Sequence, residues 1–153
     1  MKQLKKSDIK ELNKIIEEQF GIENFFNKKD NATEDETDEY TVIKRNNESI
    51  FFYYKGKLTP TLKLLQTHSL LKKITVDMGA IKFVTKGADI MRPGITNIDS
   101  EIKENEMIVI IDETHKKPLA VGKALLDAET MQNAEKGKVI MNIHWVGDPL
   151  WVG

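Results

Sequence analysis

The stretch Lys86–Ile95, KGADIMRPGI, combines residue types that rarely occur together. Two glycines, a proline and an arginine alternate with four apolar residues, Ala88, Ile90, Met91 and Ile95. A buried strand disfavours glycine and proline, whereas an ordinary polar loop does not need the apolar side chains. The stretch therefore predicts a helix that ends at Gly87, a short extended segment through Met91 and a turn at Arg92–Gly94.

The composition is that of a globular protein, with 40% hydrophobic and 31% charged residues among 153. This length suits one medium domain or two small ones. The absence of cysteine excludes disulfides and thiolate chemistry. No apolar run approaches the roughly 18 residues of a membrane span, and the N-terminus lacks the apolar core of a signal peptide. We expect an intracellular, cytoplasmic protein without membrane association.

Charge is unevenly distributed along the chain. The net charge is only −1, and residues 74–153 hold 9 basic and 12 acidic residues. Six acidic residues lie within 30–39 alone. A chain of this balance is not expected to bind nucleic acid indiscriminately, so any RNA contact has to use a local basic patch. The acidic run 28–39 contains no apolar residue larger than Ala32, and we expect a solvated, mobile loop.

The first half reads as helix, hairpin and helix. Apolar spacing predicts a helix that is capped by Ser7 and stopped by Gly21. Segments 40–45 and 49–54 are typical of paired strands joined at Asn46–Asn47. Thr59 and Pro60 are expected to open the second helix. The four aromatic residues Phe51–Tyr54 either have both faces covered or expose one pair as a docking surface.

The second half predicts several short strands, at 74–77, 88–91, 107–111, 118–126 and 139–143. Between them, a helix is expected over 78–86 and another from an Asp127 cap through Ala134. Gly122 is expected at a bulge or bend. Short strands with frequent turns and two small helices favour a small barrel-like sheet over a parallel α/β sheet.

Four segments in this order resemble a known family. Residues 76–95, 118–131 and 136–151 are similar to the PUA domain, named for pseudouridine synthases and archaeosine transglycosylases. GKLTPTLKLLQ, residues 56–66, resembles the pre-PUA module of the malignant T-cell-amplified sequence proteins, their archaeal relatives and ligatin. The resemblance implies an α+β fold, with a helix-hairpin-helix pre-PUA module over 1–73 followed by a PUA pseudo-barrel over 74–153. The barrel is expected to have short, mostly antiparallel strands and two small helices.

The resemblance also implies RNA binding without catalysis, at the loop between the first PUA helix and the second strand. Basic side chains and small residues there suit approach to an RNA backbone. The expected RNA-binding residues are Lys82, Lys86, Gly87, Ala88, Asp89, Arg92, Pro93, Gly94, Lys138, His144 and Trp145. For four of them an alternative without RNA contact is open: Gly87 as a helix stop, Gly94 as part of a turn, Arg92 as a surface charge, and His144 as a hydrogen-bond partner of Asp148. Trp151 is expected to be a buried plug.

The family relationship implies a translation factor whose partners are rRNA or tRNA and the small ribosomal subunit. A partner protein could bind through the pre-PUA module. Two alternatives remain open: an RNA-binding subunit of a tRNA- or rRNA-modifying enzyme, and a protein-interaction adaptor. His68, His115 and His144 show no catalytic or zinc spacing, and no phosphate-binding glycine motif occurs. We therefore expect no enzymatic activity, no cofactor and no metal.

Overall fold

A computed structural model describes residues 1–153. The chain divides into two compact units, residues 1–60 and residues 61–153. The sequence predicted a domain boundary between residues 73 and 74, and that boundary stays a prediction. Residues 61–73 belong to the second compact unit, where the backbone N–H of Leu62 donates to His144 Nε2 at 3.1 Å. The assignment of these units to a pre-PUA module and a PUA domain stays a prediction at this point.

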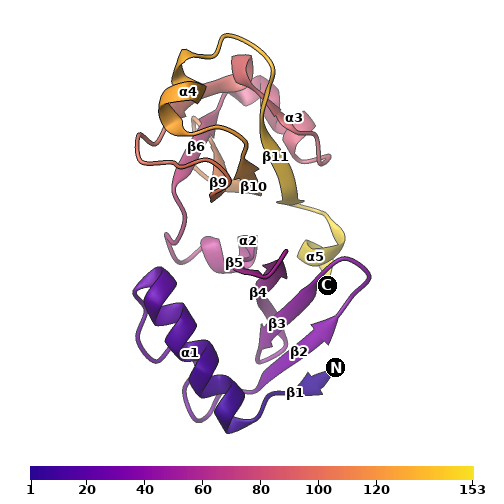
Figure 1. Ribbon diagram of the computed structural model, residues 1–153. Coiled ribbons are helices and arrows are strands. Elements are labelled where there is room, and N and C mark those ends of the chain that lie inside the picture. Colours follow the sequence, from indigo (N-terminus) through magenta and orange to yellow (C-terminus); the bar gives the residue numbers. More distant parts are fainter. The chain divides into compact units, whose positions relative to one another are not determined.

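The first unit is a five-stranded antiparallel sheet with one long helix (Figure 1). The strands pair in the order β1-β2-β3-β4-β5. In chain order its elements are β1 (Lys2–Gln3), α1 (Lys6–Phe20), β2 (Ala32–Glu36), β3 (Thr41–Arg45), β4 (Glu48–Tyr54) and β5 (Lys57–Pro60). The predicted hairpin is therefore the β3–β4 pair. Asn46 and Asn47 turn it with φ of 53° and 70°, values that asparagine tolerates better than most residues.

The acidic run was wrongly predicted to be a mobile loop. Residues Ala32–Glu36 form β2, and Ala32 and Thr33 are only 1% and 2% exposed. The run joins the sheet through backbone pairing with β1 and β3, and the small Ala32 and Thr33 side chains, which point to opposite faces, are both compatible with burial. Asp35 forms an ion pair with Lys44 of β3 at 3.0 Å, which offsets part of the local repulsion.

Helix ends in this part of the chain also differ from the prediction. Helix α1 begins at Lys6 after Lys5, so Ser7 lies inside the helix, whereas Gly21 ends it in the left-handed conformation as expected. Pro60 ends β5, an edge strand that tolerates the missing N–H. The cap of the next helix is Thr61, whose side chain accepts a hydrogen bond from the Leu64 N–H.

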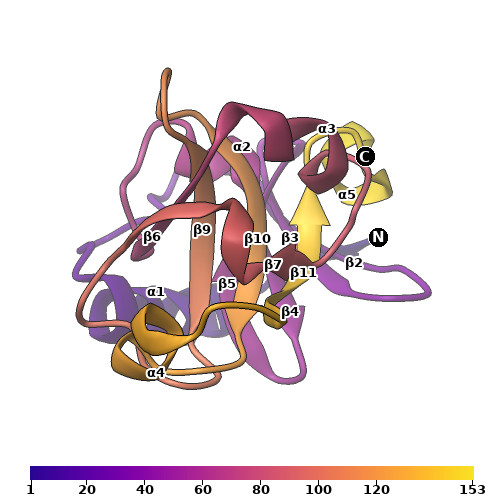
Figure 2. The same ribbon diagram turned by 90° about the horizontal axis from the view of Figure 1, so that it is seen from above.

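The second unit is a six-stranded, nearly closed sheet with the strand order β7-β11-β10-β9-β6-β8 (Figure 2). All of its pairs are antiparallel except β6 with β9. Its strands are β6 (Lys73–Val76), β7 (Ile90–Met91), β8 (Ile95–Ile98), β9 (Met107–Asp112), β10 (Pro118–Ala124) and β11 (Lys138–Trp145). Its helices are α2 (Leu62–Leu65), α3 (Ile81–Val84), α4 (Ala128–Asn133) and α5 (Pro149–Val152), with 3-10 turns η1 (Met78–Ala80) and η2 (Arg92–Gly94).

The interior of this sheet is apolar. Ile74, Ile108 and Ile110 are fully buried at its centre. The predicted bend at Gly122 is present, because the register of β10 and β11 shifts between Val121 and Gly122. A Cβ on Gly122 would lie 2.8 Å from the Met141 carbonyl oxygen, so only glycine allows this approach of the two strands. The α+β fold and the barrel-like second half are thus as the sequence predicted.

Candidate functional site

The loop after α3 is held in place by one buried side chain, that of Asn142 in β11. Asn142 Nδ2 donates to the carbonyl oxygens of Val84 and Ala88, at 3.1 and 3.0 Å. The Asn142 backbone N–H donates to Asp89 Oδ1 at 2.9 Å. Asn142 is 8% exposed, so these bonds are shielded from water. The loop is therefore preformed rather than free to adapt its backbone.

Gly87 is required at the end of α3 for two physical reasons. Its φ is +90°, a conformation that other L-residues rarely adopt. In addition, a Cβ on Gly87 would lie 2.7–2.9 Å from ring atoms of Trp145. The Gly87 N–H donates to the Val84 carbonyl at 3.0 Å. This N–H is therefore already occupied, and the open side of the glycine is filled by the Trp145 indole rather than left for a ligand.

Most of the remaining predicted residues form one exposed surface. Lys82, Lys86, Ala88, Pro93 and Lys138 are exposed, and Asp89 and Gly94 are half-buried. Lys138 Nζ lies 3.4 Å from Asp89 Oδ2, which neutralises the single acidic residue of the loop. We call Lys82, Phe83, Lys86, Ala88, Pro93 and Lys138 the loop surface. Lys82 and Lys86 leave it with a net positive charge that suits a phosphate backbone.

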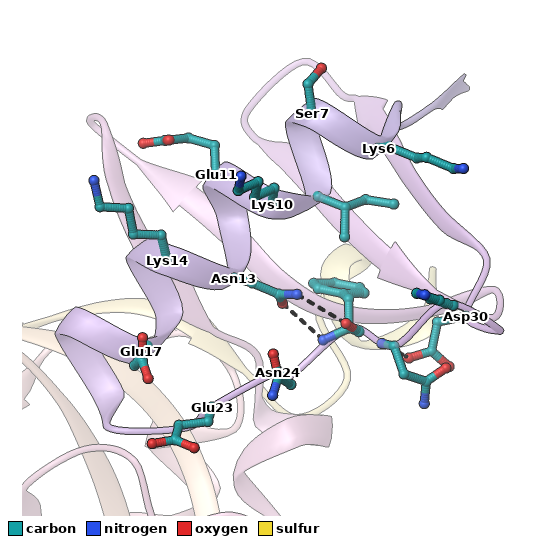
Figure 3. Close-up of a pocket in the computed structure, with 14 residues that line it drawn as sticks. Lys6, Ser7, Lys10, Glu11, Asn13, Lys14, Glu17, Glu23, Asn24 and Asp30 are labelled. Carbon is teal, nitrogen blue, oxygen red and sulfur yellow. Dashed lines mark hydrogen bonds between the residues drawn. The ribbon is translucent and has the colours of Figure 1, made fainter.

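Features elsewhere in the molecule differ from this surface. No group of three or more His, Asp and Glu side chains is arranged to hold a metal ion. No helix is long and apolar enough to span a membrane. A groove of about 980 Å³ lies between α1 and residues 23–30, as Figure 3 shows. Asn13 exchanges two hydrogen bonds of 2.9 Å with the backbone of Phe26 inside it.

Comparison with known proteins identifies the fold of the second half. The PUA domain model matches residues 72–146. Malignant T-cell-amplified sequence 2 of Homo sapiens is 37% identical over 97% of this chain and 88% of its own length. The chain belongs to the PUA-domain family of the malignant T-cell-amplified sequence proteins. An uncharacterized protein of Methanocaldococcus jannaschii is 44% identical over 97% of this chain and 93% of its own length.

Other PUA relatives carry names that refer to translation and RNA. Translation machinery-associated protein 20 of Saccharomyces cerevisiae is 35% identical over 77% of this chain and 67% of its own length. A hypothetical protein of Pyrococcus horikoshii has a solved structure with a TM-score of 0.81 and 31% identity, covering 98% of this chain and 96% of its own. One chain in the structure of an H/ACA RNP bound to a substrate RNA is also similar, with a TM-score of 0.51 and 26% identity. The match covers 61% of this protein and 28% of that chain.

Within this PUA domain, Arg92 has a structural role that the sequence did not predict. Its Nε donates to the Met131 carbonyl at 2.8 Å, and its Nη1 donates to the Ile95 carbonyl at 3.2 Å. These bonds tie the turn η2 to helix α4 across the barrel. A contact between Arg92 and phosphate would therefore compete with two existing hydrogen bonds. In this structure Arg92 holds η2 against α4.

The expected RNA contact by His144 is wrong for this structure, because the side chain is only 1% exposed. The alternative, a hydrogen-bond pair, is what the structure has: His144 Nδ1 lies 2.8 Å from Asp148 Oδ2. Since His144 Nε2 accepts from the Leu62 N–H, the proton of the neutral ring is on Nδ1. Burial raises the pKa of Asp148, but hydrogen bonds from His144, Trp151 and Trp145 outweigh it and lower that pKa.

The two tryptophans of the PUA domain have different surroundings from those expected. Trp145 is half-buried, and part of its ring lies against Gly87, so only the rest of the indole is open to a base. Trp151 is half-buried rather than a buried plug. The Lys63 ammonium lies 5.6 Å from its ring centroid, a cation–π geometry.

Phe83 is a surface residue that the sequence reasoning missed. Its side chain is 57% exposed, and the Lys82 ammonium lies 5.1 Å from its ring centroid. Met78 and Met91, at 40% and 51% exposed, flank the same segment of chain. A signal was available in the sequence, because the predicted apolar helix face of Ala80, Ile81 and Val84 leaves Phe83 outside it.

Proposed function

We propose that this protein binds RNA through the loop surface, without catalysis, as a translation-associated factor of the cytoplasm. The observation that carries the proposal is an exposed pair of lysines beside a rigid loop, on a domain whose relatives are named for the translation machinery. Lysines at this spacing neutralise phosphates, and an exposed aromatic ring between them offers a stacking face. The rigid backbone lowers the entropy that binding has to overcome.

We infer further that the RNA partner is rRNA or tRNA and that the site of action is the small ribosomal subunit. The yeast relative supports a role in translation by its name, and it matches 77% of this chain. Co-sedimentation of the protein with purified small ribosomal subunits tests this proposal. Recovery of the protein with a modifying enzyme, and none with the subunit, would instead favour the role of an RNA-binding accessory subunit.

The contact itself is tested by changing Lys82 and Lys86 together to glutamine. RNA affinity should fall, and the slope of log affinity against log salt should decrease by about 1.4 for a single-stranded RNA, or about 0.7 per phosphate contact. Lys103→Gln is a suitable control, because Lys103 is exposed and lies outside the loop surface. An unchanged slope in the double variant would exclude the loop surface as the phosphate contact.

A second candidate function is a protein-interaction adaptor. It is favoured by the exposed Phe83, Met78 and Met91, since large apolar side chains on a surface often mark a protein contact. The two candidate functions predict different effects of Phe83→Ser in a protein that keeps Lys82 and Lys86. Loss of a protein partner with an unchanged RNA affinity would assign these exposed apolar side chains to the adaptor function.

A further inference from the structure

A second hollow in the 61–153 unit lies away from the loop surface. This cavity of about 260 Å³ is open to solvent and is bordered by residues 65–71, by β9 and by the beginning of β10. Its apolar walls include Leu65, Leu70, Val109 and Ile111, and Lys73 and Lys116 also line it. We call it the β9 cavity. Strands β10 and β11 lie between β9 and β7 in the sheet, and β7 directly follows the loop after α3.

The charged side chains that line the β9 cavity are all basic. None of the residues that line it is acidic, whereas two lysines and His68 are present. Neither Lys73 nor Lys116 takes part in an ion pair, in contrast to Lys72, whose Nζ lies 2.9 Å from Glu106 Oε2. The larger groove beside α1 differs, because its four lysines face three glutamates and Asp30. The β9 cavity is therefore the hollow whose charge selects an anion.

The loop that carries Lys116 is held in a fixed shape. The buried carboxylate of Asp112 accepts hydrogen bonds from the backbone N–H groups of Thr114, His115 and Lys117. Lys116 itself has a φ of +55°, an uncommon conformation for a lysine, and its N–H donates to the Asp112 carbonyl at 3.1 Å. Such conformations persist where the surroundings fix them, and they concentrate at functional sites. The Lys116 backbone is thus placed before any ligand arrives.

The opposite wall supplies polar groups at the end of α2. Thr67 Oγ1 donates to the Leu64 carbonyl at 3.2 Å and lies 2.9 Å from His68 Nδ1. These hydrogen bonds hold the Thr67 and His68 side chains in place beside the apolar side chains that line the cavity. The site therefore combines an apolar surface, ordered hydroxyl and imidazole groups and two unpaired ammonium groups. A ligand that matches it has a weakly polar body and a negative charge.

We propose that the β9 cavity binds one nucleotide of a single-stranded RNA segment, with the base on the apolar floor and the phosphate at Lys73 and Lys116. The proposal rests on the RNA-binding function inferred for the loop surface and adds a second, separate contact. Pockets for drug-sized ligands usually measure about 300–1,000 Å³, so this smaller cavity suits a single nucleotide. Among the lining residues, His68 supplies an aromatic ring for a base, and the two lysines supply the phosphate neutralisation with which proteins hold unpaired strands.

The first test measures binding of a fluorescent decamer of uridine RNA as a function of salt. The variant Lys73→Gln with Lys116→Gln should lower the salt slope by about 1.4, with weaker binding at every salt concentration. Lys103→Gln should bind as the unaltered protein does. If the unaltered protein fails to bind the decamer, both proposals fail. If Lys82→Gln with Lys86→Gln lowers the slope and the cavity variant does not, only the β9 cavity proposal is overturned.

The second test locates the ligand by NMR of the intact 15N-labelled protein. Uridine 5′-monophosphate should shift the amide signals of Thr67, Ser69 and Lys116 more than inorganic phosphate does at equal ionic strength. N-acetyl-leucine distinguishes a peptide carboxylate from a nucleotide, since it also joins an apolar group to an anion. Shifts at these residues with N-acetyl-leucine and none with the nucleotide would overturn the RNA assignment.

Discussion

The two units of this protein are stabilised by different kinds of interior. In residues 1–60, aromatic and aliphatic side chains fill the core, with Phe51 in contact with the rings of Phe20 and Phe25. In residues 61–153, an apolar barrel is supplemented by buried Asp112, Asn142, His144 and Asp148. Apolar contacts are non-directional, whereas buried hydrogen bonds fix geometry. The proposed RNA-binding surface lies on the unit whose loops are fixed by such bonds.

The aromatic residues illustrate the same contrast. Phe51 and Phe52 are fully buried, and Tyr53 and Tyr54 are half-buried, so the run does not expose a pair of rings. The predicted alternative of an aromatic docking surface on this strand is wrong. The exposed ring is the isolated Phe83 of α3. A cluster of aromatics in a strand forms core, while a single aromatic outside a helix's apolar face reaches the surface.

The largest expected effect separates these two aromatic environments. Phe51→Ala removes a fully buried ring and should lower the free energy of unfolding by about 3–5 kcal/mol. Urea denaturation followed by circular dichroism measures this loss. A change below about 1 kcal/mol would show that the core of the first unit does not depend on this ring.

The next effect concerns the glycine that accommodates Trp145. Gly87→Ala places a Cβ too close to the Trp145 ring. It should lower the free energy of unfolding by about 1–3 kcal/mol more than Gly137→Ala does. Gly137 is the matched control, because its φ of +94° is similar and nothing lies within 4 Å of its Cβ position. Thermal unfolding of both variants isolates the contact with Trp145. Equal losses would mean that backbone strain alone selects glycine at 87.

A smaller, pH-dependent effect is expected from the polar interior of the second unit. Burial raises the pKa of Asp112, but backbone N–H groups of His115, Lys117 and Thr114 outweigh it and lower that pKa. The carboxylate's contribution is present above the usual aspartate pKa of about 3.9 and is lost as pH falls through the lowered value. Asp112→Asn should therefore lower stability at pH 6 and flatten its decline below about pH 4. Urea midpoints across this range measure the difference, and an unchanged decline would contradict it.

The smallest effect on stability is expected at the exposed ring. Phe83→Ser should change the free energy of unfolding by less than about 0.5 kcal/mol, because the side chain is 57% exposed. The same denaturation assay as for Phe51 makes the two numbers directly comparable. A loss as large as that of Phe51→Ala would mean that Phe83 supports the fold, and its proposed surface role would then be withdrawn.

The sequence by itself determined the order of the elements and the nature of the fold. Apolar periodicity placed the helix ending at Gly21, the β3–β4 hairpin and strands β9, β10 and β11, because these segments carry strong local patterns. The helix cap at Asp127 and the bulge at Gly122 were equally local signals. The family followed from motifs in order, and the comparisons confirmed it.

Only the tertiary structure decided what the individual site residues do. Strand β2 forms because a neighbouring strand pairs with it, which its acidic composition could not indicate. Arg92 and His144 form hydrogen bonds with residues 39 and 82 positions away in the chain. Their structural roles therefore depend on how the barrel closes. The β9 cavity likewise arises from segments about 40 residues apart, because burial and ligand access are properties of packing rather than of local sequence.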